Sequence, residues 1–198
     1  MRFFIASLLA LAVMAGSGRF PTRAESAQAT NASAVESMQQ KLTYLEQNGA
    51  LARPNQAPTK ITEQEVNAYL SSGRIKLPSG VQSLQLHGDP GVVTGTSRVD
   101  FDQVKAGQRN SSPLLSVFSG VHDVVVVAHA HGVGHQGLVH VDSVSLDGIE
   151  IPHFALELFV EKYIQPRYPG IGIDSQFNLP DKIDTAVIGQ REVTVTQR

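Results

Sequence analysis

The chain has 198 residues, of which 41 % are hydrophobic and 17 % are charged, so it is too apolar to be a disordered protein. Sixteen basic and eighteen acidic residues give a net charge of −2, and no lysine- or arginine-rich run supplies the basic face that nucleic-acid binding requires. Cysteine is absent, which excludes disulfides, cysteine-ligated metals and thiol catalysis.

Residues 1–24 have the order of a secretory signal peptide. Arg2 supplies a positive charge, residues 3–15 are apolar and uncharged, and small residues follow. This apolar run is shorter than the ~20 residues that cross a bilayer as a helix, although an uncleaved membrane anchor is the alternative interpretation. Cleavage after Gly18 or after Ala24 would leave a small residue at the new end. The pattern predicts export, and the missing cysteines favour a bacterial periplasm or cell envelope.

Residues 25–60 are predicted to form a flexible lead, an amphipathic helix and a linker. Ser33 precedes Glu36 by three residues, which is a capping box at the start of a helix. Apolar side chains then recur at spacings of three and four, as one helical face requires. These side chains are Val35, Met38, Leu42 and Leu45. We expect a helix over 33–48 and a proline-containing linker over 50–60.

The segment 61–198 is predicted to form one α+β domain. Thr62 and Glu65 form a second capping box before a short helix, and beyond it apolar and polar residues alternate as they do in strands. The predicted strands span residues 81–87, 92–101, 121–131, 136–146, 183–188 and 191–197. A long loop is expected over 105–120 and an apolar helix over 153–165. This order predicts a mostly antiparallel, curved sheet of hairpins that packs with one apolar helix and is preceded by N-terminal helices.

A Gly-x-Gly-x-x-Gly pattern over 132–137 follows the apolar run 124–127, as a dinucleotide site would. That mechanism requires a helix next, whose N-terminus holds the pyrophosphate, whereas residues 138–144 alternate like a strand. We therefore interpret the glycines as a hairpin turn. The acidic residues are scattered and no Gly-x-Ser-x-Gly elbow occurs, so the sequence predicts neither an enzyme nor a cofactor.

Histidine is concentrated in the same hairpin, where four of the seven histidines fall within twelve residues. With a turn over 132–135, residue 131 pairs with 136, 129 with 138 and 127 with 140. This register places His129, His131 and His140 on one face of the sheet. A zinc or copper site is one interpretation. A solvated, hydrogen-bonded face opposite the valines of the strand is another, and a pH-sensitive surface is a third.

The predicted helix 153–165 is apolar on most of its sides, which is typical of a helix that is buried or that contacts an apolar ligand. An apolar groove between this helix and a curved sheet supplies affinity without catalytic residues, since each buried CH₂ contributes about 0.8 kcal/mol. The candidate ligand-binding residues are Phe154, Leu158, Phe159 and Tyr163 of the helix and Val124 and Val126 of the strand.

Three segments carry a resemblance to known proteins. They are Ile61–Leu70 (ITEQEVNAYL), Val144–Pro152 (VSLDGIEIP) and Phe177–Ile183 (FNLPDKI). In these segments the chain resembles uncharacterised exported bacterial proteins and, more distantly, envelope lipid-binding proteins of the tubular lipid-binding superfamily. The resemblance covers residues 60–198 and implies a lipid-facing groove between helix and sheet. The histidine hairpin is not part of that pattern.

The sequence thus predicts an exported, non-enzymatic envelope protein that binds a lipid or another apolar small molecule. Two alternatives stay open. One is a metal-binding protein built on the histidine hairpin. The other is a structural or interaction module whose helix 33–48 docks on an envelope protein, and a membrane surface is a further partner that this location allows.

Overall fold

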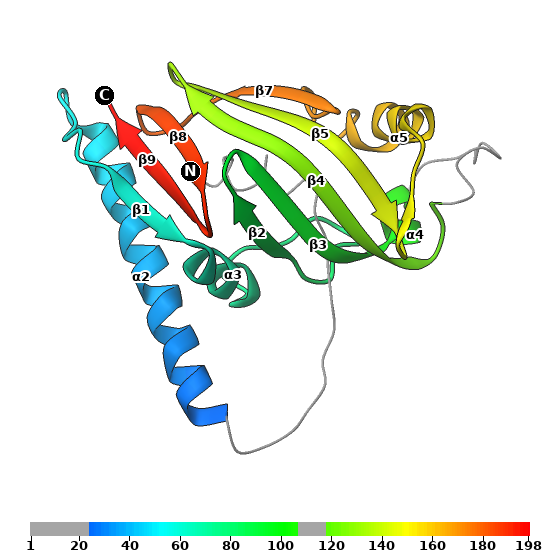
Figure 1. The fold of residues 1–198 in the computed structure, drawn as a ribbon, viewed down its shortest axis with the longest axis horizontal. Helices are drawn as coiled ribbons and strands as arrows, with labels where there is room; N and C mark the ends of the chain where they lie inside the picture. Colours follow the sequence, from blue (N-terminus) through cyan, green and yellow to red (C-terminus); the bar gives the residue numbers. More distant parts are fainter. Residues whose placement is uncertain (1–23, 107–117) are drawn as a thin grey trace.

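The computed structural model describes residues 24–106 and 118–198. The predicted signal peptide therefore lies outside the described residues except for Ala24, and so does most of the predicted loop 105–120. Within the described parts the chain forms an antiparallel sheet with helices at two of its ends, which confirms the predicted α+β class (Figure 1).

Short runs of strands are separated by helices along the chain. The helices are α2 (Ala24–Ala50), α3 (Glu63–Ser71), α4 (Phe101–Lys105) and α5 (His153–Phe159), which continues as one π-helical segment, η2 (Val160–Ile164). The strands are β1 (Thr59–Thr62), β2 (Gln85–Asp89), β3 (Val92–Asp100), β4 (Val121–Val133), β5 (Gln136–Leu146), β6 (Ile149–Glu150), β7 (Asp174–Asn178), β8 (Ile183–Gly189) and β9 (Glu192–Gln197).

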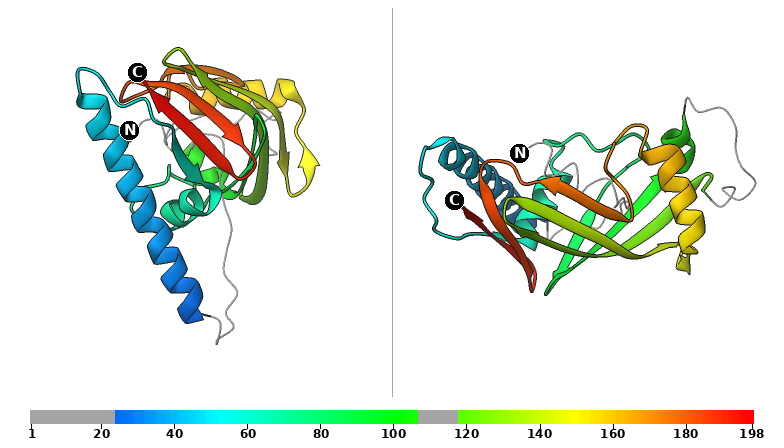
Figure 2. Two further views of the ribbon diagram at one scale, coloured as in Figure 1. Left: turned by 60° about the vertical axis from the view of Figure 1, so that its left-hand side comes forward. Right: turned by 90° about the horizontal axis from the view of Figure 1, so that it is seen from above.

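Strands β4 and β5 form the centre of the sheet, and one edge of β4 is shared by two other strands. Residues 121–129 of β4 pair with β3, whereas His131 and Gly132 pair with β8 on the same edge. Two groups of strands therefore leave this edge, β3–β2 and β8–β9–β1. On its other edge, β5 pairs with β6 and β7. Figure 2 shows the resulting bent sheet, with α2 at one end and α5 at the other.

The apolar core lies on one face of this sheet. Alternate side chains of β4 are buried from Val124 to Ala130, while His129 between them is exposed. At the α5 end the core includes Val124, Val126, Phe159 and Tyr163. At the α2 end a second cluster joins both N-terminal helices to the sheet. Its buried members are Met38, Leu45, Ile61, Tyr69, Leu179, Ile183 and Val195.

The β4–β5 hairpin turns more tightly than the sequence predicts. Its loop is the pair Gly134–His135, and both residues have positive φ, at 59° and 64°, as a type I′ turn requires. Gly132 and Gly137 stay inside the strands, where a side chain on Gly137 would lie 2.5 Å from the ring of Phe177. The predicted hairpin is confirmed, but the predicted register was wrong. Residue 131 pairs with 138, and 129 pairs with 140.

Several elements differ from the prediction in where they begin or in not having been predicted at all. Strand β2 begins four residues later than expected, and Val81 makes only an isolated bridge to Val99. The short helix α4 was not predicted, and it begins where the Asp100 carboxylate accepts hydrogen bonds from two backbone N–H groups. Strands β1, β6 and β7 were not predicted either, and β1 pairs with β9 from the other end of the chain.

Glu65 joins β1, α2 and its own helix α3 through one nearly buried carboxylate. It closes the predicted capping box by accepting from the backbone N–H of Thr62, at 2.7 Å. The same carboxylate accepts from Lys41 on α2, at 2.6 and 2.8 Å, and from the hydroxyl of Ser37. Burial alone would raise the pKa of Glu65, but these donors outweigh it and lower the pKa from 4.5 to about 2.

Neutralising Glu65 should therefore destabilise the fold at neutral pH. We expect Glu65→Gln to lower the free energy of unfolding by about 2 kcal/mol at pH 7, because Lys41 loses its ionised partner. A lowered pKa stabilises the fold above its unfolded value of 4.5, and this contribution is lost as the pH falls towards 2. Urea unfolding from pH 7 to pH 2.5 should show the difference between wild type and variant shrinking below pH 4.5.

Glu192→Gln is the matched control, since Glu192 pairs with the exposed Lys60 at 2.7 Å. Such exposed pairs contribute less than about 1 kcal/mol. Equal losses in the two variants, or a Glu65→Gln effect that does not change with pH, would contradict this role of Glu65.

Candidate ligand-binding cavity

An apolar cavity of about 160 Å³ lies between the sheet and the two N-terminal helices, and we name it the α2–α3 cavity. It lies where the β8–β9–β1 group diverges from β2 and β3, and small residues of the strands contribute to its lining. These small residues are Gly88, Ala130, Gly137 and Ala186. Apolar side chains from both helices and from the strands provide most of the remaining lining. They are Met38, Leu42, Leu45, Ile61, Val66, Tyr69, Leu70, Ile75, Leu86, Val93, Leu138, Val139, Phe177, Leu179, Ile183, Ile188, Val193 and Val195.

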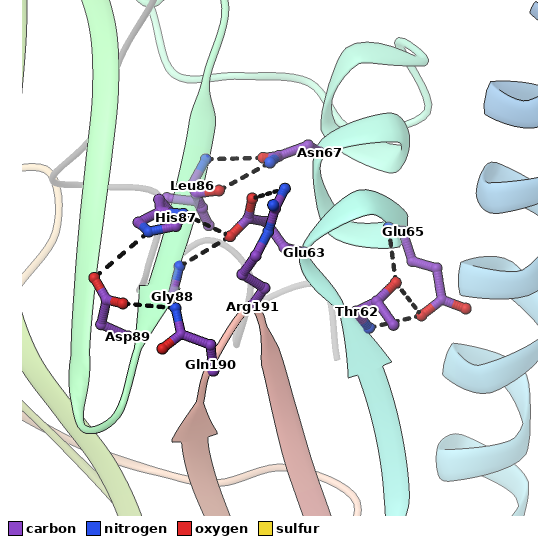
Figure 3. A network of polar contacts seen from close by, with 10 residues as sticks. All are labelled: Thr62, Glu63, Glu65, Asn67, Leu86, His87, Gly88, Asp89, Gln190 and Arg191. Carbon is purple, nitrogen blue, oxygen red and sulfur yellow. Dashed lines mark hydrogen bonds and ion pairs between the residues drawn. The ribbon is translucent and has the colours of Figure 1, made fainter. Parts of the chain in front are cut away.

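Polar side chains contribute to the lining where α3 meets the β2–β3 turn and the β8–β9 turn (Figure 3). Glu63, in the first turn of α3, is only 13 % exposed; it forms ion pairs with His87 and Arg191 and accepts one backbone hydrogen bond. Its carboxylate lies 2.8 Å from His87 Nδ1, 3.1 Å from Arg191 Nη2 and 3.2 Å from the backbone nitrogen of Gly88. This carboxylate therefore holds α3, β2 and the β8–β9 turn together.

Arg191 is the second junction at this edge of the cavity. Its backbone N–H donates to Gly88 at 2.7 Å, and its carbonyl accepts from the N–H of Glu63 at 2.8 Å. Arg191 also has a φ of +56° in the two-residue turn between β8 and β9. A side chain in this left-handed conformation costs about 1 kcal/mol, which glycine would avoid. The site thus keeps an arginine at a position where the backbone favours glycine.

Asp89 and Asn67 complete the polar network that Figure 3 draws. Asp89 accepts from Gln190 at 2.9 Å and lies 3.5 Å from His87 Nε2. The Asn67 amide exchanges two hydrogen bonds of 2.8 Å with the backbone of Leu86, which fixes β2 against α3. The carboxylates at this edge are thus already engaged with protein donors.

A second cavity, also of about 160 Å³, lies at the α5 end of the sheet. Four of the six predicted ligand-binding residues line it, namely Val124, Val126, Phe159 and Tyr163. Phe154 and Leu158 do not contribute to this lining, and their side chains are 58 % and 39 % exposed. The structure thus brings together four predicted residues and separates the other two, because α5 turns one side towards the sheet and the other towards solvent.

The α2–α3 cavity was missed by reasoning from the sequence. Its lining comes from segments between Met38 and Val195, and the carboxylate, imidazole and guanidinium at its edge lie at positions 63, 87 and 191. No local spacing connects such distant residues. The only local signal was the capping box, which places Glu63 in the first turn of α3 next to the end of β1.

His129 and His140 lie on the exposed face of the sheet, opposite the buried valines, as one of the predicted interpretations holds. His131 is exposed as well but also contributes to the lining of the α2–α3 cavity. The observed register places His129 directly opposite His140. Each imidazole pairs with a separate carboxylate: His129 with Asp142 at 2.8 Å, and His140 with Asp174 at 2.6 Å. Among residues 24–106 and 118–198, no three or more histidine or acidic side chains gather in a way that could hold a metal ion.

His122 has a different environment at the start of β4. Its Nδ1 lies 2.6 Å from Asp147, and its Nε2 lies 2.7 Å from the carbonyl oxygen of Ser119. Two acceptors on the two ring nitrogens require both to carry a proton, so the arrangement favours the imidazolium. The hydrogen bond to Asp147 raises the pKa of His122 above 6.5.

No known protein family, curated protein or solved structure gives a significant match to this chain. The resemblance to envelope lipid-binding proteins therefore stays a prediction. Within the part of the chain that the structure describes, none of the helices has the length and apolar content that a membrane span requires.

The histidine–aspartate pairs lead to an NMR prediction. We expect Asp147→Asn to lower the pKa of His122 and to leave that of His140 unchanged, while Asp174→Asn should do the reverse. Imidazole Cε1–H shifts followed from pH 5 to pH 9 measure both groups in one sample. The His122 contribution to stability is present below pH 6.5 and is lost as the pH rises through the raised pKa. An unchanged His122 titration in Asp147→Asn would refute the assignment.

Proposed function

We propose that this protein is an exported, non-enzymatic envelope protein that binds a lipid or another apolar ligand, with the apolar chain in the α2–α3 cavity. The observation that carries the proposal is the lining of this cavity. Apolar side chains from two helices and from both diverging groups of strands, β3–β2 and β8–β9–β1, converge on one space. Ligand sites of this kind are mostly apolar, with a few polar groups that fix orientation.

The size of the cavity favours part of a chain rather than a whole lipid. A volume of about 160 Å³ is close to that of engineered apolar cavities of ~150 Å³ that bind benzene. An alkyl segment of about six carbons would gain roughly 5 kcal/mol on burial. Much of this gain offsets the lost freedom of the ligand, so a bare chain should bind weakly, in the micromolar to millimolar range.

The α5 cavity is the less favourable of the two sites for such a ligand. Its aromatic side chains already contact one another, with ring centroids 4.2 Å apart for Phe118 and Phe159 and 5.2 Å apart for Phe159 and Tyr163. Opening this cluster would cost favourable aromatic contacts. A chain in the α2–α3 cavity is not opposed by such a cluster.

The two alternatives from the sequence receive less support. The apolar stripe of α2 packs on the protein's own sheet, where Met38 and Leu45 are buried, so this face is not free to dock on an envelope partner. The histidine hairpin supplies separate histidine–aspartate pairs rather than a converging ligand set. The export proposal depends on residues 1–24 and is independent of the cavity.

Filling the cavity should abolish binding of a neutral chain. Val193 on β9 lines the cavity, so Val193→Phe should reduce the affinity for 1-octanol at least tenfold by occupying the space. An NMR titration of backbone amides with 1-octanol measures the affinity, and a thermal melt verifies that the variant is folded. Filling an empty apolar cavity commonly preserves or raises stability.

Val187→Phe on the adjacent strand is the matched control. Val187 is 57 % exposed, does not line the cavity and pairs with Thr194, next to Val193. The control should bind 1-octanol like the wild type. If the wild type shows no titration of residues around the α2–α3 cavity, or if both variants lose binding equally, the cavity is not the ligand site.

A further inference from the structure

At the polar edge of the α2–α3 cavity the carboxylates already have protein partners, whereas the guanidinium of Arg191 keeps N–H donors that can bind a ligand. The Glu63 carboxylate already forms ion pairs with His87 and Arg191 and accepts a hydrogen bond from the backbone of Gly88. Asp89 already accepts from Gln190 and faces His87. Glu192, which also lines the cavity, pairs with the exposed Lys60 at 2.7 Å. An incoming cationic headgroup would therefore have to displace a protein partner from any of these three carboxylates.

Arg191 is the main source of remaining hydrogen-bonding capacity at this edge. A guanidinium carries five N–H donors, and among the described residues the side-chain partner of Arg191 is one carboxylate, that of Glu63, 3.1 Å from Nη2. The Arg191 side chain is 68 % exposed, and the residue also lines the cavity. Its free donors can therefore reach a group at the cavity edge while the rest of the ligand is buried.

The backbone at Arg191 provides a second, independent observation. Its φ of +56° favours glycine, and its two backbone hydrogen bonds, to Gly88 and from Glu63, could be made by any residue. The backbone of this turn therefore does not require an arginine, whose side chain contributes to the fold only through the ion pair with Glu63.

We propose that Arg191 binds the anionic headgroup of a single-chain amphiphile whose chain occupies the α2–α3 cavity. A carboxylate or phosphate group matches the planar fork of the guanidinium, which donates two parallel hydrogen bonds to such oxygens. Glu63 acts as a positioning residue, because its ion pair at 3.1 Å orients the guanidinium. This inference rests on the proposed function and adds the charge class of the ligand to it.

Matched eight-carbon ligands test the headgroup separately from the chain. Isothermal titration calorimetry at pH 8 compares octanoate, octyl phosphate, 1-octanol and octylammonium in the full chain. We expect octanoate, octyl phosphate or both to bind roughly three- to tenfold more tightly than 1-octanol, as a partly exposed charged hydrogen bond allows. Octylammonium should bind no better than 1-octanol. The tighter of the two anions assigns the headgroup as carboxylate or phosphate.

The decisive variant is Arg191→Gly, which removes the guanidinium and relieves the positive φ, and a thermal melt verifies that it stays folded without the ion pair to Glu63. It should bind octanoate and octyl phosphate no more tightly than it binds 1-octanol. Arg98→Gln is the control, because Arg98 is an exposed arginine on β3 that pairs with Asp123 and does not line the cavity. It should retain the full preference.

The failures of the two proposals are distinguishable. If the wild type binds 1-octanol and the anions equally, or if Arg191→Gly keeps the anion preference, the headgroup assignment is wrong while apolar binding stands. If octylammonium binds most tightly, the site selects cations and the assignment is again wrong. If none of the four ligands binds, the proposed function itself fails.

Discussion

The rest of this structure depends on one constraint, which is that two strands, β3 and β8, share the same edge of β4. A single strand of 13 residues gives the first part of one edge to β3 and the last part to β8. Because two strands follow one another along the same edge, the sheet divides into two groups of strands that diverge. The apolar face between them cannot be covered by the sheet alone, and α2 and α3 pack across it. The α2–α3 cavity is the space that this packing leaves.

Few interactions hold the two groups of strands together, and they are concentrated at the two hairpin turns. Backbone N–H groups of Gly91 and Arg191 donate to Ile188 and Gly88, at 3.1 and 2.7 Å. Helix α3 adds further interactions through the side chains of Glu63 and Glu65, which lie only two residues apart. Glu65 faces α2 and is stabilised as a carboxylate by Lys41, whereas Glu63 faces the turns and holds Arg191 and His87. One short helix thus organises both the packing of α2 and the polar edge of the cavity.

Features that depend on neighbouring residues were predictable from the sequence. The capping box of Thr62 and Glu65, the alternation along β4 and the glycine hairpin all follow local rules, and the α+β class follows from their order. The exact register was not predictable. Whether Gly132 sits in the turn or the strand depends on side chains that pack against it from residues 179 and 186, far along the chain.

The candidate site was only partly predictable, because it is made by long-range pairing. Helix α5 was expected to be apolar, but which of its sides faces the sheet is decided by packing with Phe101 and Phe118, so Phe159 is buried and Phe154 is exposed. The α2–α3 cavity requires β1 to pair with β9, residues more than a hundred positions apart in the chain. Arg191 can be recognised as part of the site only when the β8–β9 turn is seen to pack against β2 and α3.

The most direct test of the central claim is the location of a bound chain. Anomalous diffraction from crystals soaked with 8-bromo-1-octanol locates the bromine at the end of a neutral chain. The structure predicts a bromine peak inside the α2–α3 cavity, among the most buried lining residues Leu45, Ile183 and Val195. A peak in the α5 cavity, or on the surface alone, would contradict the assignment of the α2–α3 cavity as the ligand site.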